Sequence, residues 1–302
     1  MAAAIALAEG TVPRRMTALA RIWRKRCASP PADFPRWPLE RISGRVNDRL
    51  PSQRAPRAAR GKETPMPTVQ PKAIVFDTFG SVVDWRSSLI VDLTAYGETK
   101  GVKADWAALV DAWRAAYHPS MDRVRKGQQP WTKLDDLHRA SLDHLVAEFG
   151  IKGLSEADLE HINLGWHRLH PWPDSVPGLT RLKSRFIIGP LSNGNVSLLL
   201  NMAKFAGIPW DMIFGSDLFQ HFKPDPETYL GTAHLLGIRP GQLMMAAAHN
   251  NDLAAARSCG LLTAFFPRPG EYGPHQKRDT KAEADWDIVA TDIQDLATQL
   301  GV

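Results

Sequence analysis

A regular alternation of strand and helix patterns is the feature that most constrains how this chain folds. Short apolar runs rich in β-branched or aromatic side chains are typical of buried strands, and the stretches between them repeat apolar residues at helical spacing. The predicted strands are residues 73–76, 186–191, 212–216, 243–248, 262–266 and 286–290, and the last predicted helix is 293–300. This alternation favours an α/β fold, a doubly wound parallel sheet with right-handed crossovers.

A long helical stretch interrupts the alternation between the first two strands. Residues 106–114 and 134–146 repeat apolar side chains at helical spacing, and no strand pattern occurs between residues 85 and 171. A helical insertion of this size is suited to cover the edge of a sheet where chemistry takes place. We therefore predict an α/β core domain formed by residues 66–84 and 171–302, and a helical cap domain formed by residues 85–170.

The amino-terminal segment differs from the rest in charge. Residues 1–65 carry 14 Lys and Arg against 5 Asp and Glu, whereas the rest of the chain carries 23 against 27. Three interpretations compete: a targeting peptide, a basic arm for nucleic acid or membrane, and an upstream start codon with translation beginning at Met66. We favour the third, because Met66 lies just before the first strand, and we expect residues 1–65 to be mostly disordered.

Composition excludes several classes of function. Beyond residue 65 the chain is mildly acidic, which argues against nucleic acid as a partner. Cys27 and Cys259 are the only cysteines, so neither a disulfide framework nor a paired-cysteine metal site can form in the main domain. No apolar run is long enough to span a bilayer. We therefore predict a cytoplasmic protein with no membrane partner.

Polar residues follow four of the predicted segments: Asp77, Ser192 with Asn193, Lys223, and His249 with Asp252. Parallel α/β sheets bind ligands beyond the carboxyl ends of their strands, so these side chains should meet at one edge. Taken singly, each has an ordinary structural explanation, such as a helix cap or a solvated lysine. Together, two carboxylates with a lysine between them stay ionised, and an ionised, positioned Asp is a nucleophile.

The order of these segments, 77–81, 191–194, 223–225 and 251–253, resembles the four motifs of the haloacid dehalogenase (HAD) superfamily. Within it, the chain is similar to the type II L-2-haloacid dehalogenases. Phe79 stands where the phosphatases of the superfamily carry a second Asp as general acid. Ala247 and Ala248 stand where those phosphatases carry an acid that helps to hold Mg²⁺. The spacing of Lys223 and Tyr229, and the dipeptide at 113–114, also match the dehalogenases.

The resemblance implies metal-independent hydrolysis of short 2-haloacids by water, with no cofactor, in a Rossmann-like core of the HAD type. Asp77 would attack C2 of the substrate, expel the halide and form an ester. Lys223, supported by Tyr229, would keep Asp77 ionised, and Asp252 would orient Lys223 and the hydrolytic water. A homodimer is plausible on the same ground.

The resemblance also implies the substrate-binding residues. Arg114 and Asn193 would bind the departing halide, where charge develops in the transition state. Ser192, with backbone N–H groups near Ser81, would hold the substrate carboxylate. Two apolar walls that exclude bulk water would come from Phe79 and Trp131.

The chain departs from the dehalogenase pattern at its last motif. Residues 247–249 read Ala-Ala-His in place of Ser-Ser-Asn, and Asn251 stands in place of a substrate-facing Trp. His249 is thereby a candidate general base for the water, while the substrate-facing wall becomes more polar. The preferred halide stays open. Two alternatives also stay open, a Mg²⁺-dependent small-molecule phosphatase and a non-catalytic binding module on the same fold.

Overall fold

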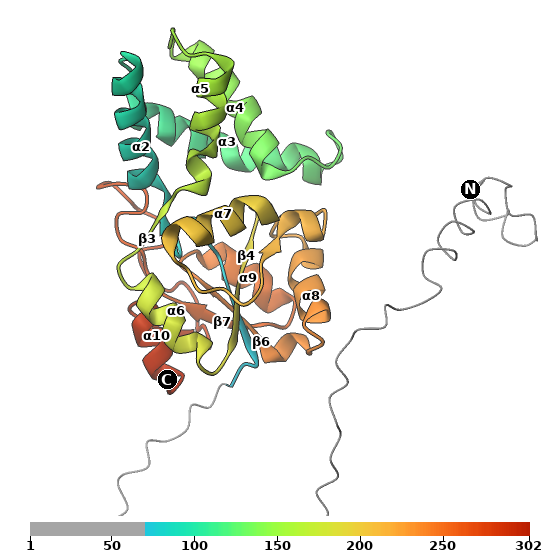
Figure 1. Cartoon of the computed structure of the whole chain (residues 1–302). Coiled ribbons are helices and arrows are strands. Elements are labelled where there is room, and N and C mark those ends of the chain that lie inside the picture. The colour runs from blue at the N-terminus through green and yellow to red at the C-terminus, as the bar shows by residue number, and fades with distance from the viewer. Residues whose placement is uncertain (1–69) are drawn as a thin grey trace, which may run out of the picture. The chain divides into compact units, whose positions relative to one another are not determined.

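The computed structural model describes residues 70–302 (Figure 1), and the predicted extension at residues 1–65 lies outside them. The core is a six-stranded sheet in the order β5-β4-β1-β6-β7-β8, with every neighbouring pair parallel. Its strands are β1 (Ala73–Phe76), β4 (Ile187–Ser192), β5 (Phe214–Gly215), β6 (Leu243–Ala247), β7 (Leu262–Phe265) and β8 (Ile288–Val289). The predicted doubly wound parallel sheet is confirmed.

Helices cover both faces of the sheet, as the largely apolar strands require. In β1, Ile74 and Phe76 point into the core cluster that includes α6 and α10, whereas Ala73 and Val75 point into the cluster that includes α8 and α9. These helices are α6 (Ser175–Lys183), α7 (Val196–Ala206), α8 (Pro226–Leu235), α9 (Asn250–Ser258) and α10 (Ile293–Gln299). Because β1 lies between β4 and β6, the residue after it sits at the middle of the carboxyl edge.

The insertion between β1 and β4 is helical, as predicted. It contains α2 (Trp85–Lys100), α3 (Trp106–Arg125), α4 (Leu134–Glu148), α5 (Glu156–Asn163) and the 3₁₀ helix η1 (Leu164–His167). Asp84 and Asp105 cap α2 and α3 by accepting a backbone N–H, and Gly101 ends α2 in a left-handed conformation. Figure 1 shows these helices gathered on the side of the sheet where β1 ends. No helix within residues 70–302 is long and apolar enough to cross a membrane.

A short two-stranded ribbon joins the insertion to the core, and the sequence did not predict it. β2 (Val83–Asp84) pairs antiparallel with β3 (His170–Pro171). Two residues per strand are too few to produce an alternating pattern, which explains why none was visible. The hydroxyl of Ser175 also donates to the carbonyl of Val82 at 2.7 Å. The two chain crossings between core and cap therefore lie side by side.

Polar contacts also tie the cap helices to the loops at the carboxyl edge. Asn195 donates its side-chain amide to Asp135 of α4 at 2.9 Å. Arg125, at the end of α3, donates to Asp225 at 2.8 Å. Because these two core residues follow Asn193 and Lys223 in the chain, the cap is held against the segments that carry the predicted site.

Packing between α6 and α10 depends on the glycine at position 178. A Cβ there would lie 2.7 Å from Cγ2 of Ile293 and 2.8 Å from its carbonyl carbon. We predict that Gly178→Ala lowers the free energy of unfolding by about 1–2 kcal/mol, because overpacking outweighs the gain in helix propensity. Urea unfolding measures this. Gly241→Ala is the control, since its Cβ meets nothing closer than 3.8 Å; equal losses in both variants would contradict the close packing.

Candidate active site

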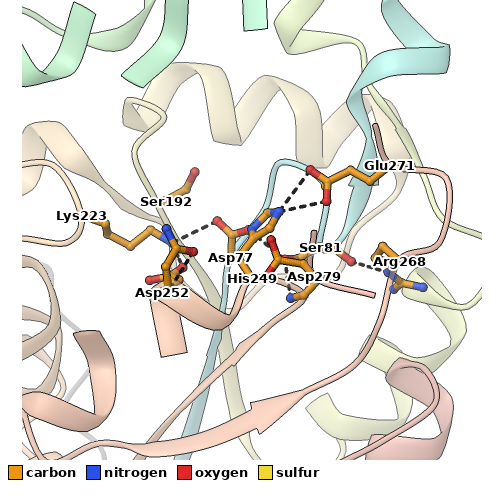
Figure 2. A network of polar contacts seen from close by, with 12 residues as sticks. Asp77, Ser81, Ser192, Lys223, His249, Asp252, Arg268, Glu271 and Asp279 are labelled. Atoms are coloured by element: carbon orange, nitrogen blue, oxygen red, sulfur yellow. Dashed lines mark hydrogen bonds and ion pairs between the residues drawn. The ribbon is translucent and has the colours of Figure 1, made fainter. Parts of the chain in front are cut away.

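Asp77 lies at the floor of a cavity of about 390 Å³ between the sheet edge and the cap. Its backbone N–H donates to the carbonyl of Ala246, which extends the pairing of β1 with β6 by one residue. The chain then turns at Gly80, whose φ of +90° is a conformation that favours glycine. The buried strand and the turn together place the carboxylate of Asp77 in the lining of the cavity, and Figure 2 shows it pointing toward Lys223.

Lys223 lies between two carboxylates in the same cavity. Its Nζ donates to Oδ1 of Asp77 at 3.0 Å and to Oδ2 of Asp252 at 2.5 Å (Figure 2). The hydroxyl of Tyr229 donates to the other oxygen of Asp252 at 2.6 Å. The side-chain carbonyl of Asn193 accepts the backbone N–H of Lys223 at 2.7 Å. The structure therefore brings these five predicted residues together.

The ionisation of this cluster follows from burial and charge. Burial alone would raise the pKa of Asp77, but the charge of Lys223 and the contacts with His249 and Ser81 hold that pKa well below its usual value. Burial opposes the charged form of Lys223, yet the two carboxylates raise its pKa above the usual value. For Asp252, burial and the neighbouring charge of Asp77 raise the pKa. Of the two carboxylates, Asp77 therefore has the lower pKa.

His249 connects Asp77 to a third buried carboxylate. Its Nδ1 lies 2.8 Å from Oδ2 of Asp77, and its Nε2 lies 2.9 Å from Oε2 of Glu271 (Figure 2). Burial would lower the pKa of His249, but Glu271 and Asp77 raise it well above the usual value. The two carboxylates beside the ring thus favour the protonated form of His249.

Glu271 was not predicted as a site residue. It comes from the long irregular segment between β7 and β8, and it is fully buried. Its Oε1 accepts the indole N–H of Trp85 at 3.1 Å. The carboxylate fills the space beside Gly80, where a Cβ would lie 2.1 Å from Oε1. No periodicity or motif marks this segment, so only the fold reveals the contact.

Arg114 of α3 lines the cavity from the cap side, as predicted. Its guanidinium carbon lies 4.3 Å from the ring centre of Tyr117 and 5.2 Å from that of Trp85. Within residues 70–302, Nη1 of Arg114 is buried without a hydrogen-bond partner. Burial and the charges of Arg114 and Arg278 lower the pKa of the neighbouring His118 to about 4. A buried, unpaired guanidinium N–H is suited to bind an anion.

The other predicted residues differ in whether they contact Asp77, line the cavity or lie outside its lining. Ser81 donates its hydroxyl to Oδ2 of Asp77 at 2.8 Å. Phe79 and Asn251 line the cavity. Ser192 is buried, and its hydroxyl accepts the backbone N–H of Gly194. Trp131 packs on Phe222, with ring centres 4.8 Å apart, outside the set of side chains that line the cavity.

A buried ion pair fixes the turn that carries Ser81. Arg268 donates to both oxygens of Asp174, at 2.6 and 2.9 Å, and its Nε donates to the backbone carbonyl of Ser81. Arg268 lies near Ser81 in Figure 2. The segment after β7 also provides further cavity residues that the sequence analysis missed: Tyr272, Arg278, Asp279 and Glu283.

A magnesium ion, which the phosphatases of the superfamily use, does not fit these residues. Lys223 pairs with both Asp77 and Asp252, so each of these carboxylates already has an ion-pair partner. The side chains at 247 and 248 are alanines, which offer no oxygen ligand. No group of three or more His, Cys, Asp or Glu in residues 70–302 has an arrangement that could hold a metal ion.

Comparisons with known proteins agree with the fold and the motifs. The family model for haloacid dehalogenase-like hydrolases matches residues 71–260. The crystal structure of a defluorinating L-2-haloacid dehalogenase is 52% identical, with a TM-score of 0.75, covering 78% of this chain and 96% of that one. A second L-2-haloacid dehalogenase structure is also 52% identical, with a TM-score of 0.75, and covers 76% of this chain and 98% of that one.

Curated relatives include both activities weighed above. An (S)-2-haloacid dehalogenase of Xanthobacter autotrophicus is 25% identical over 208 residues, 65% of this chain and 75% of the relative. A phosphoglycolate phosphatase of Neisseria meningitidis is 31% identical over 195 residues, 64% of this chain and 78% of the relative. The predicted resemblance is thereby confirmed, and this chain belongs to the haloacid dehalogenase-like hydrolases, with L-2-haloacid dehalogenases as structural neighbours.

Proposed function

We propose that this protein hydrolyses the carbon–halogen bond of short 2-haloacids through an ester on Asp77. The observation that carries the proposal is the ionised Asp77 carboxylate, held by Lys223 in a cavity where Phe79 occupies the position of a phosphatase acid. A carboxylate kept ionised and partly dehydrated is a competent nucleophile toward carbon. The dehalogenases that are 52% identical support the same activity.

In the first step, an oxygen of Asp77 bonds to C2 of the substrate while the carbon–halogen bond breaks. Oδ2 already accepts hydrogen bonds from Ser81 and His249, whereas Oδ1 accepts a hydrogen bond only from Lys223 among residues 70–302. Oδ1 is therefore the better placed nucleophile. The halide leaves with the bonding electron pair, and the cation of Arg114 stabilises the charge that develops on it.

In the second step, water hydrolyses the ester. The water oxygen bonds to Cγ of Asp77, and the bond between Cγ and Oδ1 breaks, so Oδ1 leaves as the hydroxyl oxygen of a 2-hydroxyacid. Asp252 takes one water proton, and Lys223, 3.0 Å from Oδ1, donates one to the departing oxygen. Transfer of a proton from Asp252 to Lys223 then restores the pair. The second water proton goes to solvent when Asp77 ionises again.

Phosphate-ester hydrolysis is the second candidate, since relatives include phosphoglycolate phosphatases. Phe79 offers no proton to a leaving alkoxide, and Ala247 and Ala248 offer no carboxylate to help hold Mg²⁺. A phosphoryl group would thus find neither the acid nor the cation that its transfer requires. These two features favour the haloacid.

The nucleophile is tested with Asp77→Asn. We predict that the variant releases no halide from 2-chloropropionate, chloroacetate or fluoroacetate, because a neutral amide does not displace halide. Halide release is measured with an ion-selective electrode, and phosphate release from phosphoglycolate is measured in parallel, with and without Mg²⁺ or a chelator. Asp285→Asn, a change at a fully exposed carboxylate, is the control. Halide release by Asp77→Asn, or Mg²⁺-dependent phosphate release by the unchanged protein without halide release, would overturn the proposal.

Arg114 gives a second prediction, in which activity and stability change in opposite directions. We expect Arg114→Met to lower kcat/KM for halide release by about 10²- to 10³-fold, the effect of losing one transition-state donor. The free energy of unfolding should stay the same or rise, because a buried cation without full hydrogen bonding is replaced by an apolar side chain. Urea unfolding and steady-state kinetics check both. Arg139→Met, a change at a half-buried arginine of α4 that pairs with Asp143, should leave activity unchanged; a large loss of stability in Arg114→Met would point to a structural arginine instead.

A further inference from the structure

His249 has both ring nitrogens within hydrogen-bond distance of carboxylates. Nδ1 faces Oδ2 of Asp77 at 2.8 Å, and Nε2 faces the two oxygens of Glu271 at 3.1 and 2.9 Å. Ionised carboxylates only accept hydrogen bonds, so both nitrogens donate only when the ring carries two protons. The hydroxyl of Tyr272 is 3.3 Å from Nε2 on the same side as Glu271. The geometry thus selects the imidazolium form.

We propose that His249 is a catalytic hydrogen-bond donor to Oδ2 of Asp77, and that Glu271 is a positioning residue that keeps His249 protonated. The role belongs to ester hydrolysis and rests on the proposed function. In the ester formed through Oδ1, Oδ2 is the carbonyl oxygen. It becomes an oxyanion when water adds to Cγ, and it returns to a carbonyl when the bond from Cγ to Oδ1 breaks.

Two donors already surround the atom on which this charge develops. Ser81 and the imidazolium of His249 each lie 2.8 Å from Oδ2. Arg268 holds the backbone of Ser81, and the N–H of Ala248 donates to the Ser81 hydroxyl oxygen at 2.9 Å, which leaves its proton directed at Asp77. Donors fixed in place before the reaction stabilise an oxyanion without reorganisation. Ser81 and His249 therefore form the oxyanion site of the second step.

Glu271 matters because the charge of Asp77 disappears when the ester forms. The charged or titratable groups around His249 are Asp77 after β1, Glu271 and Tyr272 from the segment after β7, and His118 from α3, with Arg114 of α3 acting on Glu271. Of the two carboxylates, only Glu271 stays negative in the ester. It is buried and held by Trp85, so it retains its place beside His249 through the reaction. With a neutral residue in place of Glu271, His249 would lose its proton at a lower pH.

The test separates the two steps in Glu271→Gln, which keeps the shape of the side chain and removes its charge. Rapid quenching measures the halide burst, and mass spectrometry of the intact protein measures the ester. We expect an undiminished burst and accumulation of the ester, with hydrolysis about 10-fold slower at pH 8 and more than that at higher pH. Glu160→Gln, an exposed carboxylate of α5, is the matched control and should behave like the unchanged protein.

The direction in which the rate of ester hydrolysis changes with pH distinguishes this role from a merely structural one. An imidazolium donor predicts that hydrolysis slows as pH rises through the pKa of His249, which lies well above 6.5 in the unchanged protein. In Glu271→Gln the same decline should occur at least one pH unit lower. Glu271→Asp, which keeps the negative charge, should return the decline most of the way to its pH in the unchanged protein. His249→Asn, a neutral donor, should lose the decline altogether and serves if Glu271→Gln does not fold.

Two results overturn the inference. Hydrolysis that accelerates as pH rises through the pKa of His249 would make the histidine a general base. An unshifted pH profile in Glu271→Gln would mean that Glu271 contributes only packing and does not keep His249 protonated. Both outcomes require a halide burst from the unchanged protein; absence of that burst would instead overturn the proposed function.

Discussion

The contact of Lys223 with two buried carboxylates is the interaction on which the rest of the site depends. Asp77 follows β1, and Asp252 lies in the first turn of α9 after β6, so the pairing of these two strands brings like charges together. Two buried carboxylates at one edge of the sheet repel each other strongly because the surroundings have a low dielectric constant. If no cation lay between them, one of the two would take up a proton. The ammonium group of Lys223 removes that repulsion and leaves Asp77 ionised. The pairing of β1 with β6 therefore yields an ionised Asp77 only because Lys223 lies between the two carboxylates.

The charged groups nearest Asp77 pair with one another, whereas Arg114 and Arg278 stack on aromatic rings. Glu271 pairs with His249, and Lys223 pairs with the two aspartates. Arg114 contacts aromatic rings instead of a carboxylate, and one of its N–H groups has no partner in residues 70–302. A monoanionic 2-haloacid brings one negative charge and a halogen that becomes negative. A guanidinium N–H without a partner is suited to bind an anion of this kind.

The sequence was sufficient for the elements that repeat a pattern and for residues that stand at fixed places after a strand. β1 and the segments carrying Asn193, Lys223 and Asp252 were located because apolar runs end in polar residues there. The ribbon of β2 and β3 was missed, since its strands are too short to show a period. Trp131 was expected in the cavity, but its neighbour Phe222 lies on a distant segment, and no local pattern reports that contact. Tertiary contacts of irregular segments were beyond sequence reasoning.

Glu271 illustrates why such contacts carry chemistry in this fold. The segment after β7 is long, irregular and rich in Gly and Pro, which on its own predicts only a loop. In the structure its carboxylate fills the space beside Gly80, which has no side chain to exclude it. The glycine needed for the turn after the nucleophile thus also makes room for the partner of His249. A side chain at position 80 would clash with Glu271, so the contact of His249 with this carboxylate depends on the glycine at position 80.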